Sequence, residues 1–96
     1  MIASFGDKVT EAIFHGTPVR LIKRFPADVR ERAIRKLDML NAARELADLL
    51  LSPGNHLEEL KGDLKGFHSI RVNDQWRLVF RWEEAQAYQV RLIDYH

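Results

Sequence analysis

The sequence predicts an α+β domain in which helices cover one face of a small antiparallel sheet. Apolar residues of the first half recur at helical spacing, whereas beyond Pro53 they alternate with polar residues as in strands. Helices followed by consecutive strands, rather than a regular alternation of the two, are typical of the α+β class. The 96 residues are expected to form a single domain over 1–96.

The opening segments predict a strand and two helices. IASF, residues 2–5, is short and half apolar, and we expect an N-terminal strand there. Gly6-Asp7 turns the chain into KVTEAIFHG, a short helix that Gly16 ends. A longer helix is predicted over PADVRERAIRKLDMLNAA, where Pro26 suits the first turn. Its apolar stripe consists of Val29, Ala33, Leu37 and Leu40.

A second apolar stripe follows this helix directly. Its members recur at i, i+3, i+4 and i+7, and they are Ala43, Leu46, Ala47 and Leu50. The segment SPGN then breaks the pattern. Two helices joined so closely are expected to form an antiparallel helical hairpin that packs on the sheet.

Three strands complete the predicted domain. They are FHSIRV, WRLVFRW and AYQVRLIDY, with turns at Asn73-Asp74 and at residues 83–85. The alternation places Ile70, Val72, Trp76, Leu78 and Phe80 on the core face, which Tyr88, Val90 and Leu92 continue. The opposite, open face then receives Arg71, Arg77, Arg91 and Tyr95. Guanidinium groups this close repel one another unless solvent or a phosphate lies between them.

The composition excludes several classes of protein. No apolar run approaches the roughly 18 residues of a membrane span, no secretory leader follows Met1, and cysteine is absent. We therefore expect a cytoplasmic bacterial protein without a membrane partner. No residue spacing is typical of a zinc site, a glycine-rich phosphate loop or a Ser-His-Asp set, so neither metal nor cofactor is expected.

Charge is distributed unevenly along the chain, although the net charge is only +1. Residues 20–36 contain Arg20, Lys23, Arg24, Arg30, Arg32, Arg35 and Lys36 against only Asp28 and Glu31. This segment is a candidate for contact with phosphates. A solvated helix face of mixed charge is the alternative interpretation.

The segment LKGDLKGFHSIRVNDQWRLVF, followed by a strand and a terminal DYH, resembles the HigB-type, or plasmid-maintenance killer, branch of the RelE/ParE toxin superfamily. The resemblance spans nearly the whole chain and is sharpest from Leu60 to His96. It implies a RelE-like microbial RNase fold and an endoribonuclease that cuts translated messenger RNA on the 70S ribosome, in contact with ribosomal RNA. It also implies a HigA-type helix-turn-helix antitoxin as partner.

The resemblance further implies an RNA-cutting face formed by Arg77, Lys61, Asp94, Tyr95 and His96. One position departs from the pattern, because relatives can carry a histidine three residues before the KG where this chain has Glu58. Either the nearby His56 replaces that histidine, or the protein works with one fewer imidazole.

Cutting RNA without a metal uses the ribose 2′-hydroxyl as nucleophile, and it needs a base, cations for the phosphate and an acid for the leaving 5′-oxygen. Arg77, Lys61 and Arg71 are the candidate cations, with Arg91 and His56 as further substrate-binding residues. His96 is the candidate acid, because imidazole exchanges protons near neutral pH. Asp94 is expected to orient it or to act as base, and Tyr95 to stack on a base or contact a phosphate.

Two rival functions remain open at this point. A toxin of the same fold can act on another target, as the ParE branch does on DNA gyrase, although the terminal Asp-Tyr-His has no evident use there. A degenerate toxin kept only to bind its antitoxin would retain its surfaces but not its chemistry, and Glu58 would then mark the loss. Individual residues have structural alternatives as well: Asp94 as an ion-pair partner of Arg91 or Arg77, and Lys61 as part of a turn.

Overall fold

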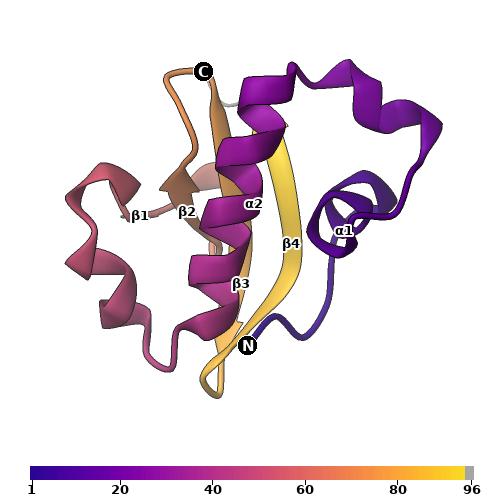
Figure 1. Ribbon diagram of the computed structural model, residues 1–96. Coiled ribbons are helices and arrows are strands. Elements are labelled where there is room, and N and C mark those ends of the chain that lie inside the picture. Colours follow the sequence, from indigo (N-terminus) through magenta and orange to yellow (C-terminus); the bar gives the residue numbers. More distant parts are fainter. Residues whose placement is uncertain (95–96) are drawn as a thin grey trace.

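The computed structural model describes residues 1–94 and contains a four-stranded antiparallel sheet with two α-helices packed on it (Figure 1). The strands are β1 (Glu58–Glu59), β2 (His68–Arg71), β3 (Trp76–Glu83) and β4 (Gln86–Asp94), and they lie in the order β1-β2-β3-β4. The helices are α1 (Lys8–His15) and α2 (Ala27–Ala42). The predicted α+β class is confirmed. Within residues 1–94, none of the helices has the length and apolar character needed to span a bilayer.

Local sequence signals explain where the two helices begin and end. The side chain of Asp7 accepts a hydrogen bond of 2.7 Å from the Thr10 amide at the start of α1, and Gly16 adopts φ 70° at its end. Pro26, which was expected in the first turn, is the N-cap residue that immediately precedes α2. The stripe of Val29, Ala33, Leu37 and Leu40 is at most 3% exposed and packs in the core, which confirms the amphipathic pattern.

The main core lies between the helices and one face of the sheet. From the strands it includes Ile70, Val72, Leu78, Phe80, Val90 and Leu92, and Trp76 packs against it, all as predicted from the alternation. β2 and β3 pair with Ile70 opposite Leu78 and Arg71 opposite Arg77. The predicted register of this hairpin is therefore confirmed, and both arginines belong to the other face.

The expected position of Tyr88 in the core is wrong. The pairing of β3 with β4 shifts register between Val79 and Arg81, and Gln89 adopts φ 55° in the bulged strand. Because one extra residue reverses the alternation, Ala87 occupies the core and Tyr88 pairs opposite Arg81 on the second face. A bulge of this kind leaves no mark in a simple period-two pattern.

The prediction of a second α-helix, which would complete a helical hairpin, is also wrong. Residues 46–51 form a 3₁₀ segment, Leu46–Leu51, in which only Leu49 is buried and Leu51 is 84% exposed. The chain is already extended at Ala43, and Pro53 disfavours helix in the residue before it. Between these positions the chain winds with three residues per turn, so Leu46 and Leu49, rather than Leu46 and Leu50, lie on the side that packs against the core. Further 3₁₀ turns lie at Arg20–Arg24, Pro53–Asn55 and Gly62–Leu64.

The expected N-terminal strand is reduced to two isolated parallel bridges, Ile2 to Ala87 and Phe5 to Val90. Four backbone hydrogen bonds of 2.7 to 3.1 Å still join residues 1–6 to β4. The bulge separates the two bridges, and there the Ser4 hydroxyl accepts a hydrogen bond of 2.9 Å from the Gln89 amide. The segment thus covers the β4 edge without forming a regular ladder.

The second face of the sheet is less open than expected. A small cluster of Leu60, Phe67 and Val79, with Leu64 and Ile93 packed against it, covers its middle. The unpredicted strand β1 supports this cover by pairing with β2, Glu58 opposite Ser69. The arginines Arg71 and Arg77 therefore lie at one end of a partly covered face.

Candidate active site

Two arginines face each other across the β2–β3 hairpin, as the sequence predicts. Arg71 and Arg77 are strand partners, and the Arg77 side chain is only 12% exposed compared with 36% for Arg71. Strand partners have neighbouring side chains on the same face. The fold therefore places two cations side by side, at a cost in repulsion that an anion between them would relieve.

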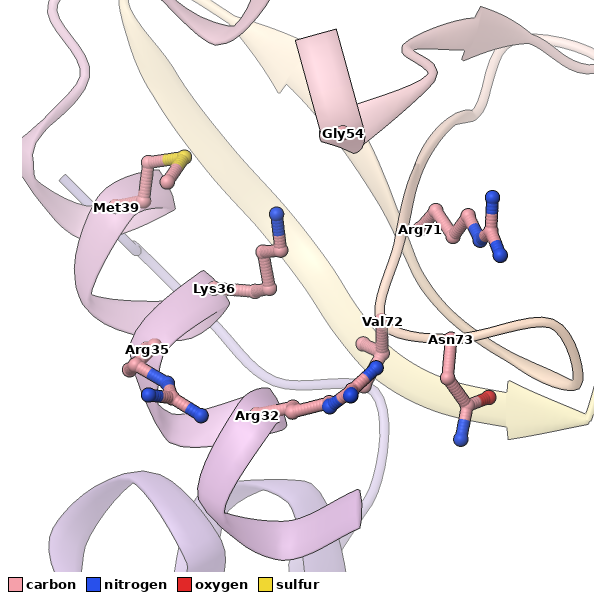
Figure 2. A pocket seen from close by; sticks show the side chains of 8 residues that line it. All are labelled: Arg32, Arg35, Lys36, Met39, Gly54, Arg71, Val72 and Asn73. Atoms are coloured by element: carbon pink, nitrogen blue, oxygen red, sulfur yellow. The ribbon is translucent and has the colours of Figure 1, made fainter. Parts of the chain in front are cut away.

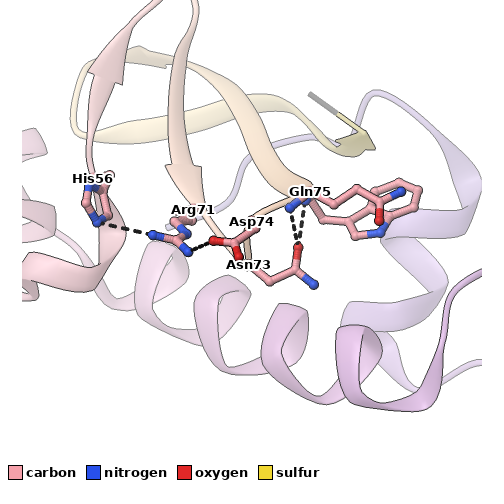
Figure 3. Close-up of polar contacts among 6 residues, drawn as sticks. His56, Arg71, Asn73, Asp74 and Gln75 are labelled. Atoms are coloured by element: carbon pink, nitrogen blue, oxygen red, sulfur yellow. Dashed lines mark hydrogen bonds and ion pairs between the residues drawn. The ribbon is translucent and has the colours of Figure 1, made fainter. Parts of the chain in front are cut away.

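Polar contacts hold both guanidinium groups in place, and Figure 3 shows those of Arg71. Arg71 pairs with Asp74 in the hairpin turn, and its Nη1 lies 3.5 Å from Nε2 of His56. Arg77 donates to the His56 carbonyl at 2.5 Å, and its Nη1 lies 3.6 Å from a carboxylate oxygen of Glu58. Arginine fixed in this way presents its remaining donors in a defined direction, which favours recognition of a phosphate.

These groups border a cavity of about 240 Å³, here called the arginine cavity, which is lined by His56, Arg71, Asn73, Asp74 and Arg77. The turn that supplies Asn73 and Asp74 is built locally. The side chain of Asn73 accepts hydrogen bonds from the amides of Gln75 and Trp76, at 2.9 and 2.7 Å (Figure 3). These hydrogen bonds within the turn help to position Asp74 beside Arg71.

His56 reaches the cavity through a tight turn anchored in the core. Asn55 is completely buried, donates to the Leu49 carbonyl at 2.9 Å and accepts from Nζ of Lys36 at 2.5 Å. The next residue, His56, adopts φ 43°, which residues with a side chain rarely do. This conformation turns the His56 carbonyl toward Arg77 and its imidazole toward Arg71.

A larger cavity of about 490 Å³, here called the helix cavity, adjoins the arginine cavity (Figure 2). Its lining residues are Arg32, Arg35, Lys36, Met39, Gly54, Arg71, Val72 and Asn73. Burial and the nearby charges of Arg32 and Arg35 lower the pKa of Lys36 below 10.5. Because Arg71 and Asn73 border both cavities, the two form one basic surface beside α2.

The remaining predicted site residues lie apart from the arginine cavity or outside the described part of the chain. Lys61 borders a separate cavity with Glu59, Leu60 and Lys65, and the Arg91 guanidinium lies 6.0 Å from the Phe67 ring. Asp94 pairs opposite Trp76, so its side chain belongs to the helix-covered face, where Gln75 donates to it at 2.9 Å. Tyr95 and His96 lie outside the described residues. The structure thus brings together Arg71, Arg77 and His56, but places Lys61, Arg91 and Asp94 elsewhere.

Sequence reasoning missed the acidic side of the arginine cavity and the basic side of the helix cavity. Glu58 and Asp74 were not expected as neighbours of the arginines. Arg32, Arg35 and Lys36 were noted only as part of a basic run, although their spacing of i, i+3 and i+4 places them on one helix face. Across residues 1–94, no three His, Asp or Glu side chains gather as ligands of a metal.

Comparison with known proteins identifies one family and relatives whose names agree with that family. The model of the family described as RelE-like toxin of type II toxin-antitoxin system HigB matches residues 3–96. Toxin HigB-1 of Vibrio cholerae serotype O1 is 39% identical over 87 residues, which cover 91% of this chain and 90% of the relative. Endoribonuclease HigB of Proteus vulgaris is 31% identical over 96 residues, the full length of both proteins.

A similar fold occurs in a solved toxin complex. One chain of the YoeB-YefM complex from Staphylococcus aureus matches with a TM-score of 0.60 and 18% identity, over 100% of this chain and 98% of that chain. At this level of identity the likeness concerns the fold alone. It agrees with the arrangement of helices and sheet described above.

Proposed function

The chain belongs to the HigB-like family of RelE-like toxins of type II toxin-antitoxin systems, and from that premise we propose that it cleaves messenger RNA on the translating ribosome. Members of the family are ribonucleases, and a relative of full length is named an endoribonuclease. The partner of such a toxin is an antitoxin. In this proposal the antitoxin is of the HigA type and carries a helix-turn-helix, and the 70S ribosome presents the substrate.

The observation that carries the proposal is the pair of adjoining basic cavities. They combine Arg71 and Arg77 with three cations of α2, against the carboxylates of Asp74 and Glu58. A surface with this excess of fixed donors suits a polyanion whose phosphates lie close to the protein. Arg77, mostly buried and held by the His56 carbonyl, is the residue best placed to bind the scissile phosphate.

The proposed reaction needs only side chains. A base removes the proton of the ribose 2′-hydroxyl, the 2′-oxygen bonds to the phosphorus, and the bond to the 5′-oxygen breaks as an acid protonates that oxygen. The products are a 2′,3′-cyclic phosphate and a 5′-hydroxyl. Arg77 and Arg71 stabilise the charge that builds on the phosphate oxygens.

In this proposal, the proton-transfer groups are two candidate bases beside the arginine pair and one acid, His96. Glu58, 3.6 Å from Arg77, and the imidazole of His56 are the candidate bases. His96 is proposed as the acid, with Tyr95 against the substrate. In support, β4 ends at Asp94 opposite Trp76, which directly precedes Arg77 in β3. Lys61 and Arg91 would then contact the substrate farther from the cleaved bond.

The proposal is tested by inducing the protein in a bacterium without its antitoxin and mapping the 5′ ends of a translated message. The same message without its start codon shows whether cleavage needs translation. Arg77→Gln should abolish the cuts, whereas Arg81→Gln should preserve them, because Arg81 lies on the same strand and face but rests over the Phe67 ring at 4.5 Å. His96→Ala tests the acid.

Other outcomes identify the rival functions. Growth arrest without RNA cuts would contradict the nuclease proposal and point to another target, such as gyrase. Neither arrest nor cuts, for a protein that still binds its antitoxin, would indicate a degenerate toxin. Equal loss of cutting in Arg77→Gln and Arg81→Gln would remove the special role of Arg77.

A further inference from the structure

Besides Arg71, which pairs with Asp74, the helix cavity is lined by three cations of α2. Arg32 and Lys36 project from α2 into the space beside Val72 and Gly54, with Arg35 next to them (Figure 2). No Asp or Glu among residues 1–94 lines this cavity. A cavity that gathers positive charge without a carboxylate is suited to an anion from outside the chain.

The spacing of charges along α2 would allow two ion pairs within the helix, and their absence is informative. Asp28 and Glu31 precede Arg32 and Arg35 by four positions, the spacing at which helical ion pairs form. Within the part of the chain that the structure describes, neither arginine forms an ion pair. Burial and, after it, the nearby charges of Arg32 and Arg35 lower the pKa of Lys36. The guanidinium groups of α2 therefore remain available to a ligand.

The position of the helix cavity relates it to the proposed cleavage site. Arg71 and Asn73 line both cavities, and the Arg71 guanidinium points away from α2, toward His56 and Asp74 (Figures 2 and 3). Arg71 thus stands at the boundary between them. An RNA strand with one phosphate at Arg77 can continue past Arg71 and place its next phosphate against α2.

The walls of the helix cavity leave room for such a strand. Gly54 borders it with no atom within 4 Å of the position that a Cβ would occupy. Met39 and Val72 add apolar surface, against which a sugar or base can pack.

We propose that the helix cavity is a second phosphate subsite, which binds the phosphodiester adjacent to the cleaved one through Arg32, Arg35 and Lys36. The inference rests on the proposed function, since it assigns the ligand to the substrate strand. Ribosomal RNA offers the same phosphodiester chemistry. The continuity of the two cavities across Arg71 favours the messenger strand over ribosomal RNA.

Binding of short DNA oligonucleotides tests this inference without cleavage, because they have no 2′-hydroxyl. The full-length protein is titrated with dTpT, which has one phosphate, and with dTpTpT, which has two, and binding is followed by NMR. The variants are Arg32→Gln and Arg35→Gln, both at exposed positions of α2. Arg20→Gln is the matched control, because it removes the same charge at an exposed position outside the helix cavity.

We expect dTpTpT to bind the unchanged protein about tenfold more tightly than dTpT, as one added charged hydrogen-bonding contact predicts. The slope of log affinity against log salt should also be steeper for dTpTpT by about 0.7, the value for one further phosphate of a single strand. Arg32→Gln and Arg35→Gln should reduce both differences while leaving dTpT binding nearly unchanged. Arg20→Gln should alter neither difference.

Three results would overturn the inference. Equal losses in Arg20→Gln and Arg32→Gln would mean that only the overall charge matters. Equal affinity of the unchanged protein for the two oligonucleotides, or no binding of either, would mean that no second subsite exists. Weaker binding of Arg32→Gln to empty 70S ribosomes, with unchanged oligonucleotide binding, would assign the cavity to ribosomal RNA.

Failure of the proposed function is recognised separately. If the unchanged protein makes no cuts in translated messages but still distinguishes dTpTpT from dTpT through Arg32, the nuclease proposal fails while the phosphate subsite stands. If it cuts messages but does not distinguish the two oligonucleotides, the subsite fails while the nuclease proposal stands.

Discussion

Replacing Asn55 with alanine should destabilise the fold more than a change of one polar side chain usually does. Asn55 is completely buried, and its amide group connects three parts of the chain. It donates to the Leu49 carbonyl at 2.9 Å and to Sδ of Met39 at 3.0 Å, and it accepts from Lys36 at 2.5 Å. Alanine can make none of these contacts.

The magnitude follows from what each partner loses. The Leu49 carbonyl would be left buried without this donor, which costs about 1–3 kcal/mol. The Lys36 ammonium is only partly buried, so water can replace much of the lost bond and we assign it about 0.5–1 kcal/mol. The expected loss is therefore about 1.5–4 kcal/mol, a large share of the roughly 5–15 kcal/mol by which domains are usually stable.

Urea unfolding of the unchanged protein, Asn55→Ala, Lys36→Met and the double variant measures this effect. Because Lys36 and Asn55 are bonded directly, the two changes should not add, and the double variant should lose about 0.5 kcal/mol or more less than the sum of the single losses. A loss under about 1 kcal/mol for Asn55→Ala, or full additivity, would refute the reasoning. Either result would mean that water or a shifted turn satisfies these groups.

Two further predictions concern Lys36 and Gly6. The pKa of Lys36 is lowered in the folded protein, so between that pKa and 10.5 the unfolded chain binds more protons and the contribution of Lys36 to stability rises with pH. The stability difference between the unchanged protein and Lys36→Met, measured by urea unfolding, should shift in favour of the unchanged protein from pH 7 to pH 10, and no shift would contradict the burial of this ammonium. A Cβ at Gly6 would lie 2.3 Å from Cγ of Arg91 and 2.9 Å from the Gln89 carbonyl oxygen, so Gly6→Ala should cost about 1–3 kcal/mol in urea unfolding. Gly54→Ala, with no neighbour within 4 Å, should cost less than about 0.5 kcal/mol, and equal costs for the two glycines would show that the close approach at Gly6 is unimportant.

The period of the hydrophobic residues was sufficient to predict the local structure where a segment keeps one period throughout. The stripe of α2 and the alternation of Ile70, Val72, Leu78 and Phe80 correctly predicted a helix, a hairpin and the face that each presents. It failed where the backbone changes period within a segment. The bulge at Gln89 moved Tyr88 out of the core, and the short stripe before Pro53 formed a 3₁₀ segment that buries Leu49 in place of Leu50.

In the candidate site, too, some features could be predicted from local sequence and others could not. That Arg71 and Arg77 would lie together followed from the register of a single hairpin, since strand partners are set by local turn geometry. The position of Glu58 next to Arg77 could not be derived from this register. It depends on the two-residue strand β1 and on the cluster of Leu60, Phe67 and Val79 that covers the second face of the sheet. Neither feature has a periodic signal of its own.

The sequence alone determined the class of fold, the arginine pair and the family, because these depend on periodicity, turns and short motifs that are local in the chain. Only the tertiary structure decided which distant groups share a cavity. The approach of α2 to the β2–β3 turn created the helix cavity, and the partly buried bond between Lys36 and Asn55 holds the turn that carries His56 to the arginines. The physical reason is that contacts between distant segments depend on how whole elements pack against one another, and no window of the sequence contains that information.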